Sequence, residues 1–540
     1  MLALLGSGLS PATPGLAASH VCPADLSVWR QTLGAEWLAC HQLADLTTTG
    51  NPYTDPNSLY GMGFPPPGSG TLNSHYTNPT GPAVAGLQLE GYFADGCNAF
   101  VAEPALVAKN GSPFVSGCTP LPGLEATCVS ACHHDGQFVV RIPDTWDGHL
   151  LAAGTPGVRD AFASDFILSD YAMEKGWAYV SQDKGNLGAD FFRSGCDETG
   201  SCASQPWAGA CTDPSQPWCA GAAVQEWNPR MRQATRTAQA LLRGLTASYA
   251  LAGLSRTYAA GISNGGYQTR RALETDTTQD RLYDGGVDWE GTLFVSTLPA
   301  GVHPATRTTG FGLFNTLPSA LLHAPGDYTN NAPDVQALAA VGFNPQSEPL
   351  WAYHWLIYWG LTQKAYRLEF DPEYTGYTCS ANTGPPCVLP PAIQVSNNDP
   401  DAMYVYSQRL QQNPALSSRL QAVANTGDFK VPLITLHGDQ DSLLPVQTDS
   451  DLYAQMVKRP GLYRYYRVAG GNHVDPQFDD HYGVDTYGNN VLRPILPCAR
   501  AALDALQAWV EHGIAAPTSH TIIRPSGASA ADLANTCSVN

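Results

Sequence analysis

Short apolar runs of strand length, each ending in turn residues, mark the second quarter of the chain. "QFVVRIP" begins at residue 137, "HLLAAGTPG" at 149 and "GWAYVSQDKGN" at 176. Runs of this length that are rich in β-branched, aromatic or apolar residues and stop at Gly, Pro or Asp are typical of buried strands. The next patterned stretch, "NPRMRQATRTAQALLRGLTASYA" from residue 228, has the composition and spacing of a helix.

The same pattern of short apolar runs that end in turn residues returns after residue 430. "VPLITLHGDQDSLLP" begins at 431 and "LYRYYRVAGGNHVDP" at 462, and each combines a strand with a following loop. "PCARAALDALQAWVEHG" (497–513) predicts a final amphipathic helix. Strands that alternate with helices predict a mostly parallel α/β sheet with helices on both faces.

One serine lies where a strand pattern changes to a helix pattern. "RTYAAGISNGGYQTRRALE" places Ser263 between Gly261 and Gly265, in the order Gly-x-Ser-x-Gly. At a tight strand-to-helix turn such a serine takes a strained conformation, and its hydroxyl projects above the sheet as a nucleophile. Because the chain has 52 glycines, a chance match in a structural turn is the alternative.

An acid and a base follow in the chain order of the α/β-hydrolase triad. Asp441 comes after an apolar strand in "LHGDQDSLLP", and His473 comes after the next strand in "AGGNHVDP". In this chemistry the histidine takes the serine proton, and the aspartate fixes the histidine tautomer. The competing residues are Asp439 for the acid, and His437 and His481 for the base. Spacing to Pro445 favours Asp441.

The oxyanion that forms during acyl transfer needs two N–H donors. The residue after the serine, Asn264, is the first, near the positive end of the expected helix. The second is expected in the loop after "HLLAAG", where Thr155 and Gly157 are the candidates because Pro156 has no N–H.

Between the patterned stretches the composition changes, which predicts the domain organisation. We expect a signal peptide, a Cys-rich N-terminal extension of loops and short strands, an α/β core in two parts, and a cap domain inserted between them. A long Cys-rich loop inside the first part is a candidate lid. The expected segments are 1–19, 20–136, 137–300 with its loop at 185–225, 301–425 and 426–540.

Composition and charge exclude several classes of partner. The 540-residue chain has a net charge of −19 with 28 Lys and Arg, so it lacks the clustered basic residues that bind nucleic acid. After the N-terminus no apolar run is long enough to span a membrane. The oligomeric state stays open.

Fourteen cysteines, many in polar Gly/Pro/Ser-rich segments, predict disulfides and export to the periplasm or the medium. The short segment before residue 20 agrees with export, although it lacks a basic start. Zinc is disfavoured because the cysteines lack zinc-ligand spacing. The expected local pairs are Cys196–Cys202, Cys211–Cys219 and Cys379–Cys387.

Two further features are interpreted as structural. The aromatic run at 351–360 is more typical of a packed helix face than of a substrate platform. Asn397, Asp399 and Asp401 are more typical of turns than of a calcium site, because EF-hand spacing is missing.

The motifs "IPDTWDGHLLAAGTPG", "GWAYVSQDKGN", "GISNGGYQTRRALE" and "DRLYDGGVDWE" resemble a group of secreted α/β-hydrolases. The group includes the D-3-hydroxybutyrate oligomer hydrolases and the tannase/feruloyl esterase enzymes. The Ser-Asn-Gly-Gly element and the Asp183-Lys184-Gly185 turn resemble the oligomer hydrolases more closely. Tannase-type enzymes carry a disulfide between cysteines beside the serine and the histidine, and here those neighbours are Ile262, Asn472 and Val474.

The resemblance covers about 137–300 and 430–512, and it implies hydrolysis of carboxylic esters without an organic cofactor. The expected substrate is a short hydroxyalkanoate oligomer or polyester, ahead of plant phenolic esters. A peptidase or amidase on the same triad is the second enzymatic interpretation, because acyl chemistry is shared. A binding module is disfavoured because every triad member is present.

Overall fold

The computed structural model describes the part of the chain that forms the sheet and its covering helices. The described residues are 21–54, 83–93, 137–157, 161–184, 224–249, 253–295, 342–350, 370–371, 409, 412–473, 475, 492–528 and 530–540.

One sheet organises the molecule. Within the described residues its ten strands lie in the order β1-β2-β3-β5-β4-β6-β7-β8-β9-β10. The pairs β1/β2, β2/β3 and β3/β5 are antiparallel, and every pair from β5/β4 to β9/β10 is parallel. The strands are β1 (Ala35–Leu43), β2 (Gly86–Phe93), β3 (Gln137–Pro143), β4 (His149–Gly154), β5 (Ala178–Gln182), β6 (Arg256–Ile262), β7 (Gly285–Trp289), β8 (Leu433–Gly438), β9 (Tyr463–Val468) and β10 (His520–Ile522).

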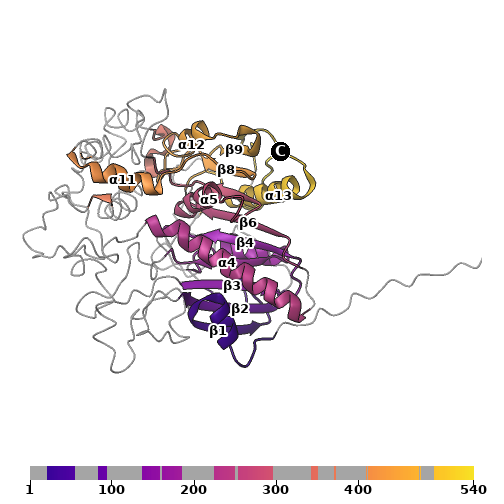
Figure 1. The fold of residues 1–540 in the computed structure, drawn as a ribbon. Helices are drawn as coiled ribbons and strands as arrows, with labels where there is room; N and C mark the ends of the chain where they lie inside the picture. Colours follow the sequence, from indigo (N-terminus) through magenta and orange to yellow (C-terminus); the bar gives the residue numbers. More distant parts are fainter. Residues whose placement is uncertain are drawn as a thin grey trace, which may run out of the picture.

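Helices cover both faces of the sheet, and the long α4 runs across one face in Figure 1. Strand residues alternate between two apolar layers, as Val139 packs with Trp177 and α13 while Val140 packs with α4. The main helices are α1 (Ser27–Leu33), α3 (Asp170–Glu174), α4 (Val224–Tyr249), α5 (Asn264–Glu274), α11 (Pro414–Val423), α12 (Ser450–Met456), α13 (Leu496–His512) and α14 (Ala530–Asn535). A π-helical turn (Asp165–Ser169) precedes α3, and 3₁₀ turns lie at Pro345–Leu350 and Pro460–Leu462.

The predicted α/β fold is confirmed, and the strands expected from residues 137, 149, 176, 431 and 462 are present. The sheet nevertheless begins earlier than expected. The strands β1 and β2 lie in the segment expected to be an N-terminal extension, yet they form one antiparallel edge of the core sheet. Their pattern is obscured because β2 buries two polar residues, Gln88 and Glu90, beside the buried Arg141 of β3.

Two disulfides lie within the described residues. Cys22–Cys40 joins the segment before α1 to β1, and Cys498–Cys537 joins α13 to the C-terminal tail. They confirm that cysteines pair in this protein. The three pairs expected from sequence lie outside the described residues, as do the signal peptide, the aromatic run at 351–360 and the acidic segment at 397–401. Of the loop expected at 185–225, residues 185–223 also lie outside them, and residues 224 and 225 belong to α4 and not to the loop.

Little of the expected cap segment is described. Its last helix, α11, contacts the core through a hydrogen bond that Tyr267 Oη on α5 donates to the carbonyl of Val423 over 2.7 Å. Among the described residues no helix is long and apolar enough to cross a membrane.

Candidate active site

Ser263 lies between β6 and α5 with φ 59° and ψ −123°. A positive φ on a serine is strained, and it persists because the surroundings fix it. The backbone N–H of Ser263 donates to Trp289 O over 2.9 Å, and its carbonyl accepts from the N–H groups of Tyr267 and Thr292. The turn is therefore anchored to α5 and to the end of β7.

The glycines around the serine allow the backbone to pack closely. A Cβ on Gly265 would lie 2.2 Å from the carbonyl oxygen of Gly154, and a Cβ on Gly261 would lie 2.4 Å from the carbonyl oxygen of Gly265. Both separations are far shorter than a carbon–oxygen contact permits. These glycines bring the elbow directly against the end of β4, where the second oxyanion loop begins.

Asp441 follows β8 and is surrounded by donors. Its Oδ1 accepts the N–H groups of Leu443 and Leu444 over 2.8 and 2.7 Å. Its Oδ2 accepts from His473 Nδ1 over 2.7 Å and from His437 Nε2 over 3.1 Å. Burial opposes ionisation of Asp441, but the His473 charge and the hydrogen bonds from both histidines outweigh it and hold the pKa of Asp441 well below its ordinary value.

His473 lies in the loop after β9, and its side chain is buried. Because Nδ1 faces Asp441, Nε2 is the ring nitrogen left to act as a base. The loop is held by its neighbours: Asn472 Oδ1 accepts the N–H of Ser442 over 3.2 Å. The competitor His437 has both ring nitrogens engaged, with Ser450 Oγ at 2.7 Å from Nδ1 and Leu444 O at 2.8 Å from Nε2.

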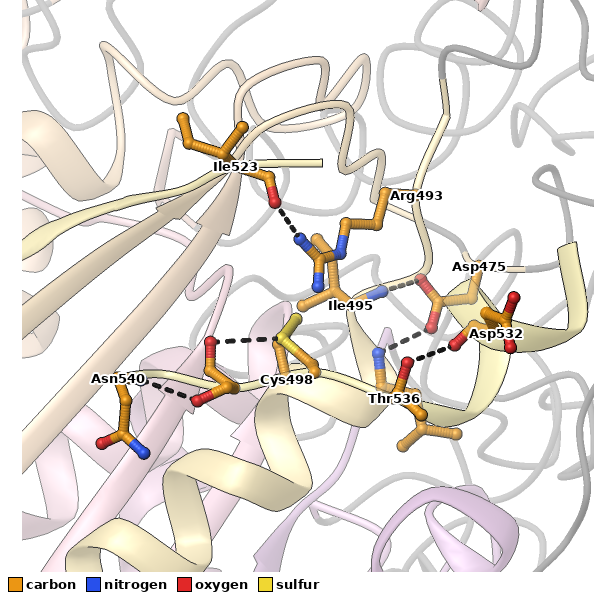
Figure 2. Close-up of a disulfide and its surroundings, with 11 residues drawn as sticks. Asp475, Arg493, Ile495, Cys498, Ile523, Asp532, Thr536 and Asn540 are labelled. Atoms are coloured by element: carbon orange, nitrogen blue, oxygen red, sulfur yellow. Dashed lines mark hydrogen bonds between the residues drawn. A yellow bond between two sulfur atoms is a disulfide. The ribbon is translucent and has the colours of Figure 1, made fainter. Parts of the chain in front are cut away.

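A second anchor of the histidine loop is drawn in Figure 2. The carboxylate of Asp475 accepts the N–H groups of Ile495 and Leu496, each over 2.8 Å, at the start of α13. An anionic group at a helix N-terminus is favourable because it satisfies free N–H groups there. The disulfide Cys498–Cys537 then ties this end of α13 to the C-terminal tail.

The remaining competitors are placed as follows. Asp439 Oδ1 accepts the N–H of Gly470 over 2.8 Å, so this carboxylate supports the turn between the acid and histidine loops. His481 lies outside the described residues.

The two predicted oxyanion elements are joined by a side chain. Nδ2 of Asn264, the first residue of α5, donates to Gly157 O over 3.2 Å, and its Oδ1 accepts from Thr292 Oγ1 over 2.8 Å. The N–H of Thr155 is directed elsewhere, to Gln268 Oε1 over 2.9 Å. Of the two residues expected to supply the second donor, Gly157 is therefore the better placed.

Lys184, the second residue of the predicted Asp183-Lys184-Gly185 turn, contacts the same loop from the end of β5. Lys184 Nζ donates to Gly157 O, and its ammonium group lies 4.6 Å from the centroid of the Trp227 ring. Lys184 also has a positive φ of 65°. The turn therefore supports the loop after β4 from the neighbouring strand, β5.

Ser263, Asp441 and His473 follow three of the parallel neighbours β6, β7, β8 and β9, so all three lie at the same edge of the sheet. Residues 392–535, which include the acid and the histidine, match the model of an alpha/beta hydrolase domain family. The fold is the α/β-hydrolase fold. No curated protein matches the chain.

Several solved structures are similar to this chain at low identity. Feruloyl esterase B from Aspergillus oryzae is 17% identical over 70% of this chain and 78% of its own, with a TM-score of 0.35. An esterase from Aspergillus oryzae is 15% identical over 89% and 87%, with a TM-score of 0.41. Candida antarctica lipase A in its closed state is 11% identical over 74% and 80%, with a TM-score of 0.37.

One buried carboxyl group at this site was not identified from the sequence. Glu290 directly follows β7, with a positive φ of 52°, and its side chain is fully buried. Its Oε1 accepts the N–H of Gly438 over 2.9 Å, and its Oε2 lies 3.5 Å from His473 Nδ1. Burial first, and then the charge of Asp441, raise the pKa of Glu290 well above its ordinary value. The sequence has no local signal for this residue, because Glu290 is a single glutamate after the weakly apolar strand "GGVDW".

Glu290, His437 and Asp441 each offer a potential metal-ligand atom, and these atoms lie within 4.8 Å of one another. The donor set does not suit a cation. The carbonyl oxygen of Leu444 lies 2.8 Å from His437 Nε2, and a carbonyl can only accept, so this nitrogen carries the hydrogen. A protonated ring nitrogen has no lone pair for a metal.

Proposed function

We propose that this protein is a serine carboxylic-ester hydrolase that uses Ser263 as nucleophile, His473 as general base and Asp441 as the orienting acid. One observation supports the proposal most strongly. A strained serine at the end of β6 shares a sheet edge with the 2.7 Å hydrogen bond between His473 and Asp441 at the ends of β9 and β8.

The reaction follows from the orientation of His473. Asp441 accepts the Nδ1 hydrogen and fixes the tautomer in which Nε2 has a free lone pair. Nε2 takes the proton of Ser263 Oγ as the oxygen attacks the ester carbonyl, and then gives that proton to the departing alcohol. Water, activated by the same nitrogen, hydrolyses the acyl-enzyme and releases the acid. The N–H groups of Asn264 and Gly157 stabilise the negative oxygen of each tetrahedral intermediate.

The substrate we propose is a short hydroxyalkanoate ester, with 3-hydroxybutyrate oligomers as the type, met outside the cytoplasm by an exported enzyme. The support is the resemblance of the Ser-Asn-Gly-Gly and Asp-Lys-Gly motifs to the oligomer hydrolases, together with their place in the site. Asn264 and Lys184 both bond to the carbonyl of Gly157, so both motifs shape the same oxyanion loop. The disulfides agree with an oxidising compartment.

The absence of the tannase-type cysteines also favours this substrate class over phenolic esters. Where that bridge would join the serine and histidine loops, the chain has Ile262 and Asn472. Asn472 bonds to Ser442 in the acid loop instead. The histidine loop is therefore held to the acid loop by an amide and not to the nucleophile strand by sulfur.

The test compares product release from a soluble 3-hydroxybutyrate trimer, methyl ferulate and a matched anilide, for the wild type and for Ser263→Ala. Ser181→Ala, a buried serine on β5, is the control for loss of a hydroxyl from the same sheet. We expect turnover of the trimer that Ser263→Ala abolishes and Ser181→Ala retains. Full activity of Ser263→Ala would refute the triad. Turnover of ferulate alone, or of the anilide alone, would keep the triad and replace the substrate class.

A further inference from the structure

The starting observation is that two carboxyl groups face one ring nitrogen. Nδ1 of His473 lies 2.7 Å from Asp441 Oδ2 and 3.5 Å from Glu290 Oε2. Both carboxyl groups are buried, and both come from strand ends that border the nucleophile strand or the histidine strand. A serine-hydrolase triad needs only one acid, so the second group requires an explanation.

The donors around each group decide which of them is ionised. Asp441 receives two backbone N–H groups and one N–H from each of two histidines. Glu290 receives the single N–H of Gly438, and the nearby indole of Trp289 adds a weaker attraction. Two adjacent buried carboxylates cannot both ionise cheaply beside one imidazole. The proton therefore resides on Glu290 and the charge on Asp441.

The surroundings of Glu290 also oppose its ionisation. The charge of Asp475 in the histidine loop adds to that of Asp441 in raising the pKa of Glu290. Glu290 also faces two histidines, His473 and His437, which do not oppose its ionisation. Its backbone is held in a left-handed conformation, which is strained for a glutamate and which persists only when the surroundings fix it. The N–H of Glu290 donates to Leu436 O over 2.8 Å, so the residue continues the β7–β8 ladder into the site.

We propose that Glu290 is a positioning residue, a second carboxyl group on Nδ1 of His473 that stays protonated while Asp441 is charged and accepts the Nδ1 hydrogen when that charge is removed. The inference rests on the proposed triad. In Asp441→Asn the repulsion on Glu290 disappears, so Glu290 releases its proton to solvent at lower pH than in the wild type. The ionised Glu290 and the neutral amide that replaces the Asp441 carboxylate then have the same total charge as the wild-type pair.

The test is a double-mutant cycle in the full-length protein, with kcat measured on the ester from pH 5 to pH 10. Asp441→Asn is expected to lower kcat by less than the about 10⁴-fold that follows when no second acid fixes the histidine tautomer, because Glu290 takes over the Nδ1 hydrogen. Its residual kcat should increase with pH as Glu290 ionises. Asp441→Asn/Glu290→Gln should lose at least a further tenfold and show no such increase. Glu290→Gln alone should lower kcat less than Asp441→Asn does.

Glu274→Gln is the matched control in the Asp441→Asn background. Glu274 is also buried, with a raised pKa, but its carboxylate bonds to Thr426, Gly427 and Tyr453, away from His473. The double variant Asp441→Asn/Glu274→Gln should have the same kcat and the same pH profile as Asp441→Asn. Thermal unfolding of every variant establishes that it is folded, and glutamine retains the acceptor for Gly438.

The inference is wrong if the Asp441→Asn/Glu290→Gln pair has the same residual rate and pH profile as Asp441→Asn. It is also wrong if Glu290→Gln costs more than Asp441→Asn, because Glu290 would then be the ionised acid. Ser263→Ala separates this result from the proposed function: retained activity there removes the triad itself, whereas lost activity leaves only the role of Glu290 at issue.

Discussion

Glu90 offers a stability prediction that is independent of catalysis. It lies on β2 and is buried, with Gln88 Nε2 donating to its Oε1. The amide of Gln88 is fixed in that orientation because its oxygen accepts from Arg141 Nε over 2.8 Å and from Asn51 Nδ2 over 2.6 Å. Burial raises the pKa of Glu90 to about 8, against an attraction from Gln88 and Arg141 that only partly compensates.

The direction in which stability changes with pH follows from the number of protons that the folded and unfolded states bind. The folded state holds the proton of Glu90 up to about pH 8, whereas the unfolded chain releases it near the ordinary value of 4.5. The folded state therefore binds more protons between these values, so its stability falls as the pH rises through that window. One pKa unit corresponds to about 1.4 kcal/mol. The difference between a pKa of 4.5 in the unfolded chain and about 8 in the folded protein therefore lowers the free energy of unfolding by about 3–5 kcal/mol across this pH range.

Glu90→Gln removes the titration but keeps the acceptor for Gln88. We expect equal free energies of unfolding for variant and wild type near pH 4, and a more stable variant at pH 8.5 by about 3–5 kcal/mol. Urea unfolding followed by fluorescence at both pH values measures the difference, and other titrating groups cancel in the comparison. A variant that is equally or less stable at pH 8.5 would show that Glu90 is not held neutral by the fold.

Three further predictions follow from the packing. Replacing Cys498 and Cys537 by alanine opens a bridge that spans 39 residues, so urea unfolding should show a loss of about 3–4 kcal/mol relative to the oxidised wild type. Gly265→Ala places a Cβ 2.2 Å from the carbonyl oxygen of Gly154, so kcat should fall at least about a hundredfold with a lower Tm. Gly244→Ala on α4 meets no atom within 4 Å, so it should raise stability by about 0.5–1 kcal/mol; a destabilised Gly244→Ala would contradict this account of the glycines.

Local patterns predict the strands that are rich in apolar, β-branched or aromatic residues and end at turn residues, and they miss the strands whose burial depends on distant partners. The strand β4 is predicted because "HLLAAG" is apolar and ends at a glycine turn. The strand β7, "GGVDW", has two glycines and an aspartate. It is stable in the sheet because Gly286 allows Leu273 to approach and because Arg270 neutralises Asp288. Neither partner is visible in a local window.

The residues of the candidate site also divide into those with a local sequence signal and those that depend on distant partners. The order Ser263, Asp441, His473 and their turn residues could be predicted from the chain, since each lies after a strand in a motif with a mechanism. Glu290 could not, because one glutamate after a weak strand has no local signature. Its significance arises from the neighbouring strand β8 and the histidine loop, which are more than a hundred residues away in sequence.

A series of buried, hydrogen-bonded polar side chains fixes the nucleophile helix α5 relative to the acid loop after β8. Arg270 on α5 pairs with Asp288 on β7 and donates to Ser450 Oγ over 2.8 Å. Because Ser450 accepts from Arg270, its own hydrogen is available to Nδ1 of His437 at 2.7 Å, and Nε2 of His437 donates to the acid loop. Each member satisfies the next, and removing one leaves a buried charge or donor unpaired. A shift of α5 would break these hydrogen bonds. The turn at Ser263 and the loop at Asp441 are therefore held in place by side chains other than the three of the proposed triad.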